Sequence, residues 1–152
     1  MRRRLRSTSA GTATGPPRVI LLDASALLAR VSGDQRGPAV SALLDSGGLA
    51  MPTIQLAEAV DVLGRRGIDA GRSREVIGSL MGEAIYSLIA LSEPIAWRAG
   101  ELRARHYHRT QRPVSLADCV FLASTQPGDA VATLDAHLAA VARDEGVEAV
   151  DL

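Results

Sequence analysis

The chain has 152 residues, with no lysine and a single cysteine, and its 17 arginines balance 17 acidic residues. The length fits one domain with an ordinary core. The composition excludes internal disulfides, cysteine-rich zinc sites and chemistry that needs a lysine, such as a Schiff base or a P-loop. No stretch approaches the roughly 18 apolar residues of a membrane span, so we expect a cytoplasmic protein without a membrane segment.

The start of the chain differs in composition from the rest. It is rich in Arg, Ser, Thr, Ala, Gly and Pro and shows no hydrophobic period, so we expect a disordered basic leader, 1–17, followed by one domain, 18–152. The leader is either a phosphate-binding arm or an over-long start. The remainder is mildly acidic, so its net charge does not indicate nucleic-acid binding.

Short apolar runs alternate with helical patterns along the first half of the domain. We expect a buried strand, two helices, a second strand and two further helices, in the order 19–22, 24–31, 38–45, 49–51, 53–63 and 72–83. Two glycines at 47–48 and Pro52 bound the second strand. Thr53 is placed to cap the helix that follows.

The same alternation continues in the second half. We expect a strand, two helices, a strand, a helix and a last strand, in the order 85–91, 95–109, 115–125, 130–134, 136–145 and 147–150. Pro94 is typical of a helix start, and residues 127–129 (Pro-Gly-Asp) form a turn before the fourth strand. Strands that alternate with helices predict an α/β fold with a mostly parallel sheet.

Four acidic residues stand beside apolar runs, where a carboxylate is costly to desolvate without a compensating partner. These residues are Asp23, Glu58, Asp118 and Asp135. Sites in open α/β sheets form beyond the carboxyl ends of the strands, so we expect the four acids to converge there. No lysine offsets their repulsion. A hard divalent cation, Mg²⁺ or Mn²⁺, is the natural partner, and such ions assist phosphodiester hydrolysis.

Each acid also has a purely structural explanation. Asp23 and Asp135 are well placed to cap helices, and Ser115 and Asp118 have the spacing of a capping box. Glu58 fits a solvated position, although its apolar neighbours make this the least satisfactory of the four explanations.

The sequence around these acids resembles PIN-domain ribonucleases. Residues 19–28 are similar to the opening motif of that family, and residues 57–60, 115–119 and 133–138 resemble its later acidic motifs in the same order. Within the family, the likeness is to the VapC-like toxins of bacterial toxin–antitoxin pairs, over about 18–152. The resemblance implies a three-layer α/β/α sandwich, a Mg²⁺ or Mn²⁺ site formed by the four acids, endonucleolytic RNA cleavage, a small cognate antitoxin and a homodimer.

Two further polar residues match the family pattern. Ser25 and Thr133 are predicted to orient the acids or a water molecule, and the alternative for both is local hydrogen bonding to the backbone. Ser25 also stands where phosphoaspartate hydrolases need a second aspartate, which excludes that class together with the missing lysine.

A basic stretch precedes Asp118. We predict that Arg105, Arg109 and Arg112 bind RNA, because guanidinium groups hold phosphates without reading base sequence. The alternative is a solvated helix face with an i,i+4 pair between Glu101 and Arg105.

The sequence thus predicts a metal-dependent endoribonuclease that acts as the toxin of a toxin–antitoxin pair. The alternative is a non-catalytic PIN-like module that binds RNA or a protein. A PIN-like nuclease should lose its cleavage activity in EDTA, whereas a binding module should not depend on the metal.

Overall fold

Five strands form the centre of the computed structural model, which describes residues 18–152. The predicted leader, 1–17, lies outside the described residues. The strands run in the spatial order β3-β2-β1-β4-β5, and every neighbouring pair is parallel, which confirms the predicted α/β sheet. Their bounds are β1 (Ile20–Leu22), β2 (Leu49–Pro52), β3 (Ile85–Ile89), β4 (Ala130–Ala132) and β5 (Glu148–Val150).

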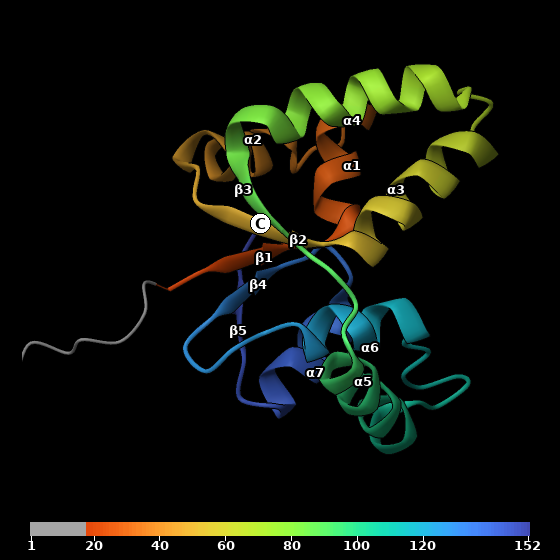
Figure 1. The fold of residues 1–152 in the computed structure, drawn as a ribbon, viewed down its shortest axis with the longest axis vertical. Helices are drawn as coiled ribbons and strands as arrows, with labels where there is room; N and C mark the ends of the chain where they lie inside the picture. Colours follow the sequence, from red (N-terminus) through yellow and green to blue (C-terminus); the bar gives the residue numbers. More distant parts are fainter. Residues whose placement is uncertain (1–17) are drawn as a thin grey trace, which may run out of the picture.

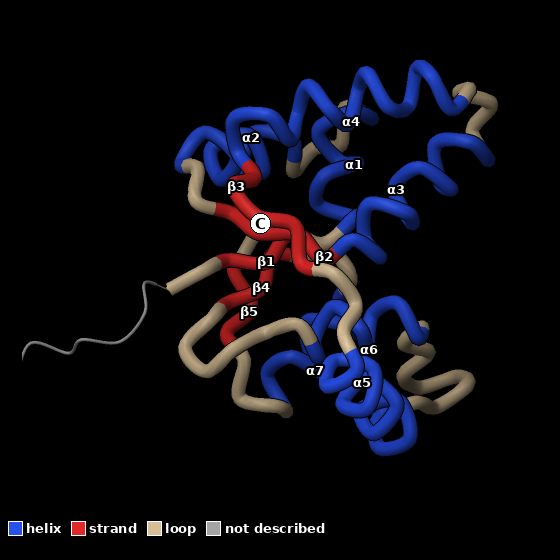
Figure 2. The backbone as a smooth tube through the Cα atoms, in the orientation of Figure 1, coloured by secondary structure: helices blue, strands red, loops and turns tan. Residues whose placement is uncertain are grey.

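Helices cover both faces of the sheet (Figure 1). One face carries α1 (Ala24–Ser32), α2 (Gly37–Ser46), α3 (Thr53–Arg65) and α4 (Ala70–Ala84). The other carries α5 (Glu93–His106), α6 (Leu116–Ala123) and α7 (Ala136–Asp144). The strands form the middle layer in Figure 2. The predicted three-layer α/β/α sandwich is therefore confirmed.

Strands β1 and β4 are apolar on both sides because each face of the sheet has its own core. Leu21 and Leu22 of β1 are both fully buried, yet Leu22 packs under α1 to α4 and Leu21 packs against α5 to α7. Val131 and Ala132 of β4 divide in the same way. Successive side chains of a strand point to opposite faces, so a strand covered on both faces has an unbroken apolar sequence.

The order of the strands places a switch point between β1 and β4. From β1 the chain extends the sheet through β2 and β3, and it then returns to add β4 and β5 on the other side. A crevice opens beyond the carboxyl ends of the strands at such a point. The backbone N–H of Asp23 donates to the carbonyl of Ala132 (3.0 Å), so the residues that follow β1 and β4 are neighbours.

Most predicted helix ends lie within two residues of the observed ones, but two predictions at helix ends were wrong. Thr53 is the first residue of α3 rather than its cap, because the extended Pro52 occupies the cap position and provides no side-chain hydrogen bond. Helix α5 ends at His106 instead of residue 109. The backbones of His108 and Arg112 pair there in an antiparallel bridge, with N···O distances of 2.9 and 3.1 Å.

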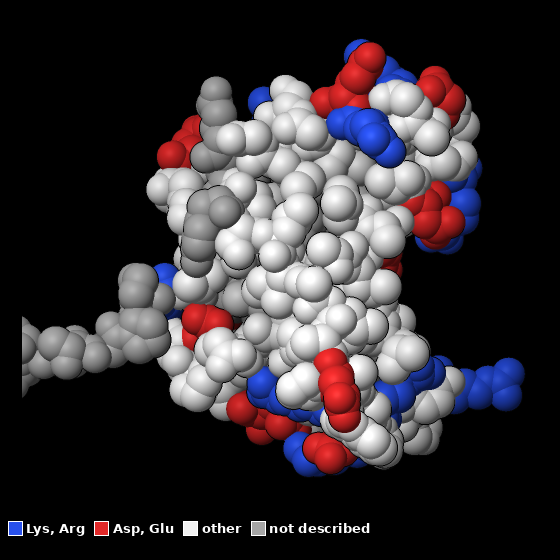
Figure 3. Space-filling view, in the orientation of Figure 1, with Lys and Arg blue, Asp and Glu red and all other residues white. Residues whose placement is uncertain are grey.

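The face of the molecule on which edge strand β3 lies has few charged side chains across its middle (Figure 3). Leu88 in β3 and Leu91 just after it are 47% and 53% exposed, and Trp97 in α5 is 70% exposed. Exposed apolar side chains of this size favour contact with another protein surface. Between residues 18 and 152, no helix has the length and apolarity needed to cross a membrane.

Candidate metal centre

Three carboxylates meet in the crevice beyond β1 and β4. Ligand oxygens of Asp23, Glu58 and Asp118 all lie within 4.8 Å of one another. Asp23 follows β1 directly, Glu58 comes from α3 and Asp118 from the first turn of α6. Two unit charges about 5 Å apart repel by roughly 3 kcal/mol at an effective dielectric constant near 20. The cluster is therefore unfavourable when all three groups are ionised and uncompensated.

Asp23 is fixed in place by two hydroxyl groups. Its Oδ2 accepts hydrogen bonds from Ser25 Oγ (2.5 Å) and from Thr133 Oγ1 (2.7 Å), and its exposed fraction is 4%. The same two hydroxyl oxygens accept from the backbone N–H groups of Leu134 and Asp135 (3.0 Å each). Burial raises the pKa of Asp23, and the hydroxyl bonds only partly oppose this. Ser25 and Thr133 thus hold the carboxylate in one orientation.

Glu58 is the acid with the least compensation. It is half-buried, and its Oε2 is inaccessible and has no hydrogen-bond partner among the described residues. Burial is the main cause that raises the pKa of Glu58, and the charges of Asp118 and Asp23 add to it. Arg65 only partly opposes these effects. A buried oxygen without a donor is costly, so this group needs a partner that the protein itself does not provide.

Asp118 combines a helix cap with a place in the cluster. The Ser115 hydroxyl accepts from the Asp118 N–H (3.0 Å), and Asp118 Oδ2 accepts from the Ser115 N–H (2.5 Å), which completes the predicted capping box. Burial raises the pKa of Asp118, the capping bonds lower it, and the charges of Asp23 and Asp135 raise it further. The cap uses one oxygen and leaves the other for the crevice.

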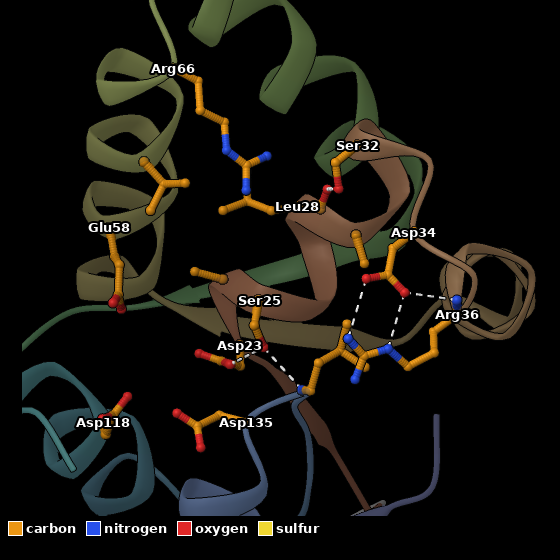
Figure 4. Close-up of a pocket in the computed structure, with 14 residues that line it drawn as sticks. Asp23, Ser25, Leu28, Ser32, Asp34, Arg36, Glu58, Arg66, Asp118 and Asp135 are labelled. Atoms are coloured by element: carbon orange, nitrogen blue, oxygen red, sulfur yellow. Dashed lines mark hydrogen bonds and ion pairs between the residues drawn. The ribbon is translucent and has the colours of Figure 1, made fainter. Parts of the chain in front are cut away.

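Asp135 lines the same pocket but lies outside the group of three. Its Oδ1 accepts from the N–H groups of His137 (2.7 Å) and Leu138 (3.2 Å), so it caps α7 as the sequence allowed. Figure 4 shows Asp118 and Asp135 facing each other across the lower part of the pocket. The structure therefore brings all four predicted acids into one pocket, three of them within ligand distance of a single ion.

A buried glutamine that the sequence analysis missed connects two of the acid-bearing helices. Gln55 is fully buried; its Oε1 accepts from the N–H of Ala24 (2.9 Å), and its Nε2 donates to the carbonyl of Ala117 (3.5 Å). These partners adjoin Asp23 and Asp118 in the chain. One signal was present in the sequence: Gln55 is spaced four and eight residues before the buried Ala59 and Leu63, on the apolar stripe of α3.

The pocket extends beyond the acids, with a volume of about 400 Å³. Its outer part is bounded by α1, the end of α3 and the loop between α1 and α2 (Figure 4). The sequence analysis assigned no role to the residues there, which include Leu28, Ser32, Asp34, Arg36, Val62 and Arg66.

Comparisons with known proteins agree with this architecture. A family model described as "PIN domain" matches residues 20–150. The chain belongs to the PIN domain family. Comparison with curated protein sequences gave no significant match.

Solved structures share the PIN fold of this chain at low identity. PAE2754 of Pyrobaculum aerophilum has a TM-score of 0.60 at 18% identity over 88% of this chain and 90% of its own. VapC20 of Mycobacterium tuberculosis, described as a sarcin–ricin loop cleaving toxin, has 0.57 at 20% over 87% and 89%. FitAcB of Neisseria gonorrhoeae has 0.58 at 24% over 87% and 96%.

The arginines predicted to bind RNA do not line the pocket of this PIN domain. Arg105 pairs with Glu145 (2.7 Å) and Arg112 with Asp144 (2.7 Å), whereas Arg109 is exposed and has no ion pair among the described residues. The alternative had Arg105 pair with Glu101, but in the structure Arg105 pairs with Glu145, the residue that ends α7. These contacts are at the end of α7 opposite Asp135, about 13 Å away along a helix of nine residues.

The residues of the PIN domain pocket fit a hard divalent cation. Three carboxylates with raised pKa values offer only oxygen ligands, and one of those oxygens is buried without a donor. Mg²⁺ and Mn²⁺ prefer such ligands, and a double positive charge offsets the mutual repulsion of the three groups. Asp23, Glu58 and Asp118 are the residues that could hold the ion.

Proposed function

We propose that this PIN domain is a Mg²⁺- or Mn²⁺-dependent endoribonuclease. One observation carries the proposal: three carboxylates from separate elements converge within 4.8 Å at the switch point of the sheet. Convergence of like charges lowers stability and has no structural benefit of its own, so it points to a function that uses them together. The non-catalytic module remains the alternative that the experiment below separates.

The pocket residues have different roles in the proposed reaction. A divalent ion held by Asp23, Glu58 and Asp118 would activate water and stabilise the charge that develops on a phosphodiester. Ser25 and Thr133 fix the Asp23 carboxylate, which limits the loss of orientation when the substrate binds. Asp135 has one oxygen in its cap and one free of it, so it is placed to support the substrate side of the pocket as a further acid.

Cleavage in the presence and absence of metal tests the proposal. We expect the purified protein to cut RNA with Mg²⁺ or Mn²⁺, to stop in EDTA, and to lose activity in Asp23→Asn. Asp61→Asn is the matched control, because Asp61 is an exposed acid of α3 that pairs with Arg65 outside the pocket. Cleavage that survives in EDTA or in Asp23→Asn would contradict the proposal, and RNA binding without cleavage would support the non-catalytic module.

We further propose that the nuclease acts as a toxin restrained by a small cognate antitoxin. Support comes from the resemblance of its acidic motifs to VapC-like toxins and from the shared fold with VapC20. Induced expression in a bacterial host should arrest growth for the wild type and not for Asp23→Asn. Co-expression of a small open reading frame beside the gene should restore growth, and unimpaired growth with wild-type protein at high level would exclude the toxin role.

A homodimer in the cytoplasm is the last part of the proposal. The exposed apolar side chains of Leu88, Leu91 and Trp97 support a protein–protein contact. Light scattering after gel filtration should give twice the chain mass of 15.9 kDa. A monomeric mass at high concentration would contradict it.

A further inference from the structure

The pocket has two chemically different ends. The inner end holds the acids, and the outer end is formed by apolar side chains with two arginines at the rim. Leu28 is almost completely buried, with an exposed fraction of 6%, and Val62 is half-buried beside it in the lining. An RNA strand alternates charged phosphates with flat bases, so a pocket that has an apolar lining between a metal site and an arginine offers contacts to both kinds of group.

Arg66 is the cation at the outer end of the pocket that is available to bind a ligand. It follows α3, and in Figure 4 its side chain runs back into the pocket toward α1. Among residues 18–152 it has no ion pair within 4.0 Å, although the pocket is rich in acids. A cation at a helix end also benefits from the helix dipole, but that effect does not require the guanidinium to enter the pocket.

The neighbouring arginines are already engaged. Arg36 donates two parallel hydrogen bonds to Asp34, from Nε to Oδ1 (3.0 Å) and from Nη2 to Oδ2 (3.2 Å). Arg65 pairs with Asp61 at 2.7 Å on the exposed side of α3 and does not line the pocket. Of these three arginines, Arg66 alone combines a place in the pocket with an unused guanidinium.

We propose that Arg66 binds the RNA phosphate next to the scissile one, so that the pocket holds two successive phosphates. The scissile phosphate lies at the acid end, the neighbouring phosphate contacts Arg66, and the nucleotide between them packs on the accessible part of Val62 in the pocket wall. The inference rests on the proposed nuclease function. Arg66 is in this sense a positioning residue, which fixes the register of the RNA through its backbone and reads no base.

The first experiment measures binding of a fluorescein-labelled single-stranded RNA of mixed sequence by anisotropy. The Asp23→Asn background with Mn²⁺ keeps the RNA intact, and Arg66→Gln or Arg65→Gln is added to it. We expect Arg66→Gln to weaken binding about tenfold, the size of one charge-assisted hydrogen bond. The slope of log K against log salt should fall by about 0.7, the value for one phosphate contact in a single strand. Arg65→Gln should change neither quantity.

The second experiment locates the phosphate. Single phosphates on either side of the cleavage site are replaced by neutral methylphosphonate in an RNA that the otherwise wild-type protein cleaves. One replacement adjacent to the scissile bond should raise KM about tenfold with kcat little changed, and Arg66→Gln should add no further loss on that substrate. Arg65→Gln should keep the full effect of the replacement.

The outcomes separate the two proposals. If the wild-type protein cleaves RNA and Arg66→Gln behaves like Arg65→Gln in both experiments, Arg66 does not bind phosphate and the nuclease proposal stands. If the losses from Arg66→Gln and from every methylphosphonate simply add, the contact to a neighbouring phosphate is excluded. If the wild-type protein cleaves no RNA with Mg²⁺ or Mn²⁺, the nuclease proposal fails and this inference fails with it.

Discussion

Two clusters of charged side chains lie at opposite ends of α7, and they are built in opposite ways. At the N-terminal end of the helix, carboxylates gather with no ion pair to a cation among the described residues, and the pKa values of Asp23, Glu58 and Asp118 are raised. At its last residues, Glu145 contacts His106 and Arg105, and the hydrogen bond from His106 is the main cause that lowers the pKa of Glu145.

The difference indicates which cluster stabilises the fold and which one serves another purpose. The cluster at the C-terminal end of α7 is called the far cluster; its acids, Asp144 and Glu145, each pair with a basic side chain. These charges are therefore compensated without an ion from solution. In the crevice the charges stabilise the protein only when an ion from solution joins them. The following predictions test this contrast, from the largest effect to the smallest.

Loss of one acid should affect cleavage in one cluster only. Asp118→Asn removes a carboxylate of the crevice and keeps an oxygen for the capping box, so we expect the rate of RNA cleavage to fall by more than about a hundredfold while the helix stays capped. Glu145→Gln in the far cluster should leave the rate within about twofold. Steady-state rates of cleavage of one RNA by both variants test this difference. Equal losses of rate in Asp118→Asn and Glu145→Gln would contradict it.

Metal should stabilise the protein through the crevice alone. At a hundred times its dissociation constant, an ion that binds only the native state adds about 2.7 kcal/mol to the free energy of unfolding. Glu58→Gln should lose this gain because it removes one ligand charge, whereas the exposed control Asp61→Asn should keep it. Thermal unfolding with and without Mn²⁺ gives the answer. A full shift in Glu58→Gln would place the ion elsewhere.

Gln55 should link the stability of the fold to the geometry of the crevice. Gln55→Ala leaves the buried N–H of Ala24 without its acceptor, which costs about 1 to 3 kcal/mol, and it frees the two helices that carry acids. Metal affinity should fall about tenfold to a hundredfold, as for other residues that orient ligands. Gln111→Ala, at an exposed position, is the control for calorimetry and metal titration. Unchanged metal affinity in Gln55→Ala would show that Gln55 acts on stability alone.

The two clusters should respond to pH with opposite signs. The pKa of Asp23 is raised by folding, so its penalty on metal-free stability is absent at acidic pH and grows as pH rises from the ordinary carboxyl range through the raised value. The pKa of Glu145 is lowered, so its contribution of up to about 1 kcal/mol is present above the ordinary carboxyl range and disappears as pH falls through the lowered value.

Urea unfolding of the metal-free protein across this pH range checks the signs. Near neutral pH, Asp23→Asn should be more stable than the wild type and Glu145→Gln less stable, and both differences should vanish at the acidic limit. A stability gain from Glu145→Gln would reverse our interpretation of the far cluster.

The sequence predicts the fold well because the spacing of apolar residues along the chain reflects which side chains of each strand and helix are buried. The unbroken apolar runs of β1 and β4 and the proline and glycine punctuation mark nearly every element. The four acids were found for a similar reason: Asp23 and Asp135 follow the apolar runs of β1 and β4, and Glu58 and Asp118 stand among apolar residues of two helices. The end of α5 was missed because a backbone pairing between His108 and Arg112 leaves no mark in side-chain periodicity.

Contacts between distant segments were beyond sequence reasoning. Gln55 reaches Ala117 across 62 positions, and Arg105 reaches Glu145 across 40. The i,i+4 spacing suggested Glu101 as the partner of Arg105, but the packing of α5 against α7 brings Glu145 to Arg105 instead. The sequence analysis assigned no role to Arg66, because the direction of its side chain into the pocket depends on how α3 lies against α1.

The parallel pairing of β1 with β4 has a consequence for synthesis of the protein. Asp23 and Glu58 are made early and Asp118 late, and the hydroxyl of Thr133 that fixes Asp23 comes later still. The wall of the crevice that carries Thr133 cannot form until β4 has emerged from the ribosome and paired with β1. A chain still attached to the ribosome therefore lacks the assembled carboxylates through most of its translation, and a truncated chain that ends before β4 never acquires them in place.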